Sequence, residues 1–196
     1  ALKAKEGKHP DMEHFKALRV LGEGGFGQVL EVVKRDCGKH YAMKVMKKNE
    51  LRDVLGGGWQ EVVKLERVLH AQCFHPLVVN LAYAFQNSQF LVLLMDVCPG
   101  GDLSPFALTK ERLTPEQVRF VGMETVSVIG FLHSRYVLYR DIKPENLLLD
   151  EAGHVRLIDF GLALQDKGKA GMPQSTEMCG TPCYMAPEVR WSRRRH

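Results

Sequence analysis

A polar loop between two apolar segments constrains this chain more than any other stretch. Residues 139–146 run Tyr-Arg-Asp-Ile-Lys-Pro-Glu-Asn and bring carboxylates, two cations and an amide together within eight residues. Apolar residues precede the loop at 137–138 and follow it at 147–149. Such flanks anchor a loop on both sides, which suits polar side chains that must be aimed at a target rather than merely solvated. Any one of these polar residues alone would fit an ordinary surface turn.

A second polar motif, Asp159-Phe160-Gly161, ends the apolar run 155–158 and begins thirteen residues after Asn146. Together, the two motifs at this spacing resemble the catalytic loop and metal-binding motif of eukaryotic protein kinases. The resemblance implies an α+β, bilobal protein-kinase-like fold. Its N-lobe is an antiparallel sheet with one regulatory helix, and its C-lobe is helical and incomplete in this sequence.

Phosphoryl transfer gives each loop residue a task, because it needs an aimed hydroxyl, metal ions and cations against spreading negative charge. The resemblance makes Asp141 the catalytic base or orienting acceptor, and Lys143 the cation that reaches the transferring phosphate. Asn146 and Asp159 offer the hard oxygen ligands that Mg²⁺ prefers. ATP and Mg²⁺ are therefore the expected cofactors.

A glycine-rich turn, Gly-Glu-Gly-Gly-Phe-Gly-Gln-Val at residues 22–29, separates two predicted strands at 15–21 and 29–34. Glycines let backbone N–H groups approach phosphates closely. Alone, this motif also fits a plain hairpin turn. The strand that follows it argues against a dinucleotide-binding fingerprint, in which a helix begins. Beside the kinase-like motifs it predicts a hairpin over ATP.

A cation inside an apolar strand is the next candidate. Lys44 lies in the predicted strand 40–46, and alone it would be interpreted as an edge-strand lysine facing water. The resemblance makes it the lysine that holds the α- and β-phosphates and pairs with a glutamate of the regulatory helix. Residues 47–58 are expected to form a basic, glycine-containing connection. The periodic apolar pattern of residues 59–72 predicts the helix itself.

Two glutamates of that helix compete as the partner of Lys44. The family interval, counted back from His75, gives Glu66, and Glu61 is the alternative. The register is not clean, because the family prefers an apolar residue four positions after the glutamate and His70 stands there. Shifting the register by one restores an apolar residue but loses the glutamate. We choose Glu66, because loss of the ion pair with Lys44 would impair function more than a histidine at the position that the family prefers to be apolar.

The resemblance also implies a nucleotide site that includes a hinge at residues 95–102. Met95 is expected behind the adenine. Asp102 is placed for the ribose hydroxyls or a basic substrate side chain, although a helix N-cap before Leu103 explains it equally well. The residues expected to bind the nucleotide are Leu21, Gly22, Gly24, Gly25, Phe26, Gly27, Val29, Ala42, Lys44, Met95, Asp96, Cys98, Asp102 and Leu148.

Further residues narrow the class of kinase. Tyr139, in place of the commoner histidine, resembles the AGC group. Lys143, with Gly-Thr-Pro at residues 180–182, resembles serine/threonine kinases, so the expected substrate is a protein with a serine or threonine acceptor. Residues 81–85 and 185–188 look closest to G-protein-coupled-receptor kinases.

Residues 162–178 are rich in Lys, Gly, Ser and Thr and resemble an activation segment. In AGC kinases the phosphorylated threonine lies two residues before the position of Cys179, which here is Glu177. Its phosphate pairs with the loop arginine, here Arg140. We expect Glu177 to take that role constitutively, since a carboxylate accepts a guanidinium pair. The alternative is that Thr176 is the phosphosite, shifted by one.

The resemblance covers roughly residues 15–189. It predicts a polar lead-in at 1–14, the N-lobe and hinge at 15–98, and a partial C-lobe at 99–196. Since a kinase domain usually continues further, the sequence suggests a fragment or a truncated product.

Composition argues against several other classes. Apolar residues make up 45% of the chain and charged residues 26%, and no apolar run is long enough for a membrane span. The five cysteines fit no zinc spacing, which favours a reduced, cytoplasmic protein. The net charge of +4 comes from four arginines among residues 190–195, without interleaved aromatics, so no nucleic acid is expected. Peripheral membrane contact would need regions outside this sequence.

Two functions of different classes remain open. The intact set Lys44, Asp141, Asn146 and Asp159 favours an active serine/threonine kinase as the parent protein. The predicted truncation favours a catalytically inactive fragment that acts as an ATP-binding, scaffold or decoy module. A phosphotransfer assay on this chain and on any longer form separates the two.

Overall fold

The computed structural model describes residues 10–24, 27–108, 112–165, 175 and 178–191. Within these ranges the chain divides into two compact units. The first holds the residues up to Gln60 together with Leu81–Val97, and the second holds Glu61–Asn80 together with the residues from Cys98 onward. The predicted lobe boundary between residues 98 and 99 stays a prediction.

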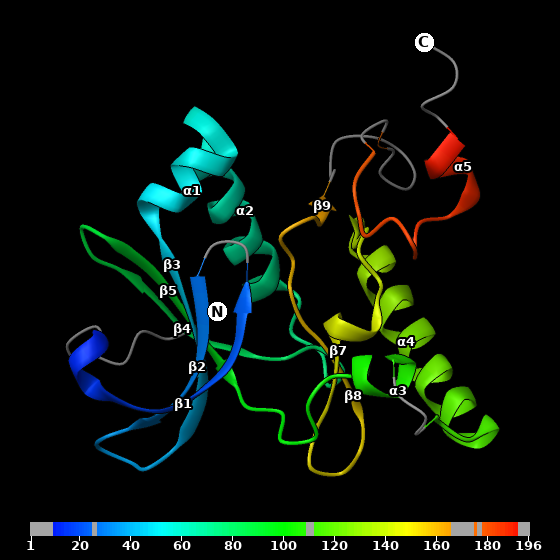
Figure 1. The fold of residues 1–196 in the computed structure, drawn as a ribbon, viewed down its shortest axis with the longest axis horizontal. Helices are drawn as coiled ribbons and strands as arrows, with labels where there is room; N and C mark the ends of the chain where they lie inside the picture. Colours follow the sequence, from blue (N-terminus) through cyan, green and yellow to red (C-terminus); the bar gives the residue numbers. More distant parts are fainter. Residues whose placement is uncertain (1–9, 25–26, 109–111, 166–174, 176–177, 192–196) are drawn as a thin grey trace. The chain divides into compact units, whose positions relative to one another are not determined.

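The first unit is built on a five-stranded antiparallel sheet in the order β1-β2-β3-β5-β4 (Figure 1). Its strands are β1 (Phe15–Gly24), β2 (Gly27–Lys34), β3 (His40–Lys47), β4 (Leu81–Gln86) and β5 (Phe90–Asp96). β3 lies in the middle of the sheet. Its buried residues Tyr41 and Met43 flank the less buried Ala42, as expected for a strand with one face on a core.

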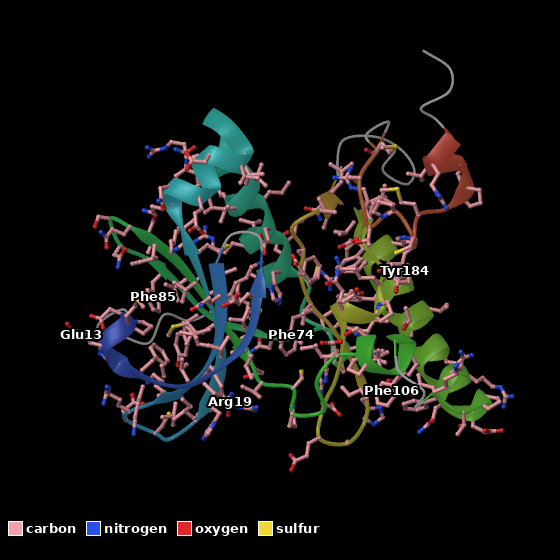
Figure 2. The ribbon with its side chains drawn as sticks, in the orientation of Figure 1. Glu13, Arg19, Phe74, Phe85, Phe106 and Tyr184 are labelled. Carbon is pink, nitrogen blue, oxygen red and sulfur yellow. The ribbon has the colours of Figure 1, made fainter. Side chains whose placement is uncertain are left out.

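Aromatic side chains form the core of this first unit. Phe15 lies edge-on to Tyr41 with ring centroids 6.1 Å apart, and Tyr41 lies edge-on to Tyr83 at 5.7 Å. Phe85, labelled in Figure 2, stacks on Phe15 at 6.3 Å. Such pairs contribute about 0.5–1.5 kcal/mol each beyond the burial of their area. These contacts fix β1, β3 and β4 against one another.

Three short helices accompany the sheet, namely η1 (Met12–His14), α1 (Lys48–Leu55) and η2 (Gly56–Gly58). The sequence predicted only a connection over residues 47–58, so α1 is a correction. Its physical reason is Leu51, which is buried and gives this short helix an apolar anchor. α1 ends at Leu55, and its C-cap residue, Gly56, has a φ of 68° that suits glycine.

The second unit combines helices, several of which are labelled in Figure 1, with two small antiparallel ladders. Its helices are α2 (Trp59–Gln72, which begins in the first unit), α3 (Ser104–Leu108), α4 (Pro115–Ser134), η3 (Pro144–Asn146) and α5 (Pro187–Trp191). β6 (Val137–Leu138) pairs with β9 (Leu164–Gln165), and β7 (Leu147–Leu149) pairs with β8 (Val155–Leu157). α4 begins at a capping box, in which the Thr114 hydroxyl accepts the Gln117 amide at 3.3 Å.

A cluster of buried side chains surrounds the polar loop. Its members come from α2, α4, the small strands and the segments between them, and are Leu69, Cys73, Val78, Leu103, Val128, Leu132, Val137, Tyr139, Leu147, Val155, Leu157, Phe160 and Ala163. Since β6 precedes loop 139–146, β7 follows it and β8 leads to Asp159, this core holds both polar motifs in place.

The predicted α+β class is confirmed, with an antiparallel sheet in one unit and most of the helical residues in the other. Among the described helices, none combines the length and the apolar character that a membrane crossing requires.

Candidate active site

Asp141 is the acceptor on which the polar loop converges. Lys143 Nζ lies 2.8 Å from Asp141 Oδ2, and Asn146 Nδ2 donates to the same oxygen at 3.1 Å. The other oxygen, Oδ1, accepts the Thr181 backbone amide at 3.0 Å and the Thr181 hydroxyl at 2.8 Å. The structure therefore brings Asp141, Lys143 and Asn146 together, as the sequence predicted. Thr181, forty residues away, was predicted only as part of a class-specific motif.

These contacts keep Asp141 charged. Burial opposes ionisation of the carboxyl, but hydrogen bonds from Lys143 and Thr181 outweigh it, so the pKa of Asp141 lies below its ordinary value. For Lys143, burial disfavours the charged form, whereas the hydrogen bond to Asp141 favours it, and the net pKa lies above the ordinary value. At neutral pH this pair is an ionised acceptor beside a cation.

Unusual backbone angles mark both polar motifs. Arg140, with φ of 69°, and Asp159, with φ of 61°, adopt the left-handed region, which costs a non-glycine residue about 1–3 kcal/mol. Buried Tyr139 links the two motifs, because its hydroxyl donates to the Ile158 carbonyl and its ring lies edge-on to Phe160 at 5.8 Å. The surrounding packing thus holds two strained residues where polar side chains must point in fixed directions.

The predicted metal ligands Asn146 and Asp159 stand at the same end of the β7–β8 ladder. Leu147 pairs with Leu157, and the Ile158 amide donates to the Asn146 carbonyl at 3.1 Å. Buried Asn146 directs its amide nitrogen at Asp141, which leaves its side-chain oxygen as the atom suited to a cation. No group of three or more His, Cys, Asp or Glu side chains suited to a metal occurs among the described residues. Two oxygen donors still fit Mg²⁺, which keeps several waters.

Glu66 and Glu61 differ sharply in environment. Glu66 is only 7% exposed, and its carboxylate lies beside Gly161, where a side chain would come within 3.8 Å of Glu66 Oε2 and 3.0 Å of Asp159 Oδ1. The Glu61 side chain is 81% exposed, and its carboxylate lies 3.9 Å from Lys64 on the same helix. Glu66 is therefore a buried carboxylate and Glu61 a solvated helix residue, while the choice of Glu66 as the partner of Lys44 stays a prediction.

Lys44 lies in a central strand, opposite Val29 of β2 and Leu93 of β5. The interpretation of Lys44 as an edge-strand lysine is therefore wrong. Ala42, two residues earlier, lies opposite Met95, so these two candidate nucleotide-binding residues are neighbours in the sheet.

Gly27 meets the steric demand expected of the glycine-rich turn. Its φ is 147°, and a side chain there would lie 2.0 Å from the Val45 carbonyl oxygen, so only glycine fits. Gly25 and Phe26 lie outside the described residues. The other candidates of this unit are placed in the sheet, with Leu21, Gly22 and Gly24 in β1, Val29 in β2, and Met95 and Asp96 in β5.

The remaining nucleotide candidates, Cys98, Asp102 and Leu148, lie in the second unit. Asp102 forms an isolated antiparallel bridge with Leu148. Its carboxylate accepts the Ser104 amide at 2.7 Å, at the start of α3. This contact favours the N-cap interpretation that the sequence left open.

The loop arginine contacts the segment that follows Asp159. Arg140 Nε donates to the Leu162 carbonyl at 2.7 Å, and Nη1 donates to the Ser175 hydroxyl at 2.8 Å. Thr176 and Glu177, the predicted partners of Arg140, lie outside the described residues. A cavity of about 340 Å³ lies beside Asp141, with Thr181 and Tyr184 (labelled in Figure 2) in its lining.

Comparison with known proteins agrees with this geometry. The family described as protein kinase domain matches residues 15–196. Protein kinase 3 of Dictyostelium discoideum is 40% identical over 187 residues, which are 91% of this chain and 20% of that protein. Serine/threonine-protein kinase Sgk3 of Rattus norvegicus is 44% identical over 183 residues, 92% of this chain and 36% of the relative. Ribosomal protein S6 kinase alpha-1 of Homo sapiens is 44% identical over 187 residues, 91% of this chain and 24% of the relative.

The chain thus spans between 20% and 37% of the length of the curated relatives it matches. The relatives Sgk3 and ribosomal protein S6 kinase are AGC-group serine/threonine kinases, the group that Tyr139 predicted.

Proposed function

This chain belongs to the protein kinase domain family, and from that premise we propose that the protein carrying it transfers the γ-phosphate of ATP to serine and threonine hydroxyls of protein substrates. The observation that carries the proposal is the ionised Asp141. It already accepts an alcohol hydroxyl, that of Thr181, at 2.8 Å. A substrate serine or threonine offers the same chemical group, and the cavity beside Asp141 is large relative to such a side chain.

The candidate catalytic and metal-binding residues of the second unit then have proposed tasks. Asp141 orients the acceptor hydroxyl and accepts its proton, and Lys143 offsets negative charge on the transferring phosphate. Asn146 and Asp159 would hold Mg²⁺, which neutralises charge on the phosphate oxygens when bound. Glu66 completes this set as a buried carboxylate beside Gly161.

In the first unit, we assign Lys44 to the α- and β-phosphates. The pairing of Lys44 with Glu66 stays a prediction from the family resemblance, as does each of the fourteen nucleotide-binding candidates. The finer likeness to G-protein-coupled-receptor kinases and the cytoplasmic location are part of the same proposal.

The test is phosphorylation of a mixed peptide library by the purified protein with ATP and Mg²⁺, with the modified residues identified by mass spectrometry. We expect phosphoserine and phosphothreonine and no phosphotyrosine. Exclusive phosphotyrosine would contradict the assigned class. Nucleotide binding without any transfer would instead support the inactive ATP-binding or scaffold module.

A further inference from the structure

A buried polar side chain on α2 has no task in the proposed mechanism. Among the described residues, the buried polar side chains are Glu66, His70 and Asn146, and only His70 remains unassigned. It is 4% exposed and stands one helical turn after Glu66 on α2. A buried polar group is costly unless it forms a hydrogen bond, so this position calls for a physical reason.

His70 contacts both Val79 and Phe160, in different ways. Its Nε2 lies 2.6 Å from the Val79 carbonyl oxygen, in a buried setting. Its ring is stacked on Phe160, with centroids 5.1 Å apart and planes 25° apart. Since a carbonyl can only accept, the contact requires that Nε2 carries the proton.

The two contacts connect His70 to the residues on either side of Asp159. The Val79 amide donates to the Leu157 carbonyl at 3.0 Å, and the Leu157 amide donates to the Leu77 carbonyl at 2.8 Å. The segment held by the imidazole N–H is therefore bonded to β8 itself. Phe160, held by the ring, directly follows Asp159, and it lies edge-on to Tyr139 of the catalytic loop.

We propose that His70 is a positioning residue for Asp159, acting through a polar tether to Val79 and a stacked ring on Phe160. This inference rests on the proposed function, in which Asp159 holds Mg²⁺. The family pattern prefers an apolar side chain at this position. An apolar side chain can fill the space against Phe160 but cannot donate to Val79, so the proposal predicts that His70→Leu is harmful here.

Hydrogen exchange of the nucleotide-free protein tests the tether without any catalytic step. We expect His70→Leu to speed exchange of the Val79 and Leu157 amides about tenfold or more, since both belong to the hydrogen bonds that the tether braces. Amides of β3 and β5 should not change. His70→Gln, which keeps a donor, should restore most of the protection. His133→Leu, the same change at an exposed histidine of α4, is the matched control.

The Mg²⁺ dependence of activity then tests whether the tether affects metal binding. The Mg²⁺ concentration for half-maximal activity should rise about tenfold in His70→Leu and less in His70→Gln, with the KM for the peptide unchanged. Wild-type exchange and wild-type Mg²⁺ dependence in His70→Leu would overturn the proposal. If no variant is active, the proposed function fails, while the exchange data still decide the role of His70.

The wild-type protein supplies a measurement that needs no stable variant. The ¹⁵N chemical shifts of His70 report which ring nitrogen carries a proton. A protonated Nε2 is expected from its contact with the Val79 carbonyl. An unprotonated Nε2 would remove the tether and with it the proposal, even if His70→Leu does not fold.

Discussion

Asp141 shows how a single carboxylate is held ionised inside a partly buried loop. Lys143 offers a charged donor to one oxygen, and Thr181 offers two neutral donors to the other. Burial alone would raise the pKa of Asp141, and these donors reverse the direction. The hydroxyl of Thr181 is the donor that can be removed with least disturbance, because valine has nearly the same shape.

Thr181→Val should therefore raise the pKa of Asp141. Because the folded pKa of Asp141 is depressed, its carboxylate stays ionised as pH falls until that lowered value is reached. Loss of one donor raises the value, so the acid limb of the kcat/KM profile should move to higher pH. Thr181→Ser keeps the hydroxyl and should leave the limb in place. An acid limb that is identical in Thr181→Val and wild type would show that this hydroxyl does not stabilise the charged form.

At the scale of elements, two features define the glycine-rich hairpin. β3 lies in the middle of the sheet, and Gly27 approaches β3 closely. The Gly27 backbone adopts a φ of 147° beside the Val45 carbonyl oxygen. Gly22, in the preceding strand, has open space within 4 Å and no positive φ. At Gly27, therefore, only glycine fits, whereas the position of Gly22 has room for a side chain.

Gly27→Ala should lower the free energy of unfolding by more than about 2 kcal/mol, because the new side chain meets backbone and the φ is strained. Gly22→Ala should change it by less than about 1 kcal/mol. Urea denaturation followed by circular dichroism measures both. Equal, small losses in the two variants would mean that the hairpin relaxes around Gly27.

The activation segment is the second element with a testable contact. Arg140 donates to Ser175 at 2.8 Å, so Ser175 joins Thr176 and Glu177, the two residues that the sequence proposed as partners of Arg140. We predict that Glu177→Ala lowers basal activity about threefold or more after phosphatase treatment, since a carboxylate pairs with arginine less strongly than a phosphate does. Ser175→Ala and Thr176→Val serve as comparisons. If dephosphorylation abolishes activity and Glu177→Ala changes nothing, a phosphorylated hydroxyl is the anchor.

Elements with long, regular patterns could be predicted from sequence, and contacts distant along the chain could not. The periodicity of residues 59–72 predicted α2, whose bounds are Trp59–Gln72. α1 was missed because it is short and rests on one buried side chain, Leu51. In the site, the motif spacing predicted Asp141 and its loop partners, whereas the contact with Thr181 depends on how a later segment folds back.

At the scale of the whole molecule, apolar side chains remain exposed along α4. Val118 is 55% exposed, Met123 59% and Val126 73%. Apolar patches of this kind favour association. We expect residues 1–196, purified alone, to elute from size-exclusion columns as oligomers or aggregates.

Polar substitutions on α4 should reverse that association. Met123→Gln with Val126→Lys should increase the monomer fraction at equal concentration, measured by light scattering. The matched double change Glu116→Gln with Arg119→Gln, on the same helix, should not. A monomeric wild-type chain with a sharp, cooperative thermal transition would contradict this expectation.

The central claim is that this kinase domain acts through Asp141, and turnover of Asp141→Asn tests it most directly. The full-length protein carrying this chain is compared with Asp141→Asn, and with Glu151→Gln as the matched carboxylate-to-amide control in an exposed turn. We predict that Asp141→Asn loses more than about tenfold in kcat, at least about 1.4 kcal/mol, while its affinity for ATP changes little. A variant that keeps more than about a tenth of the wild-type kcat would contradict the role assigned to Asp141.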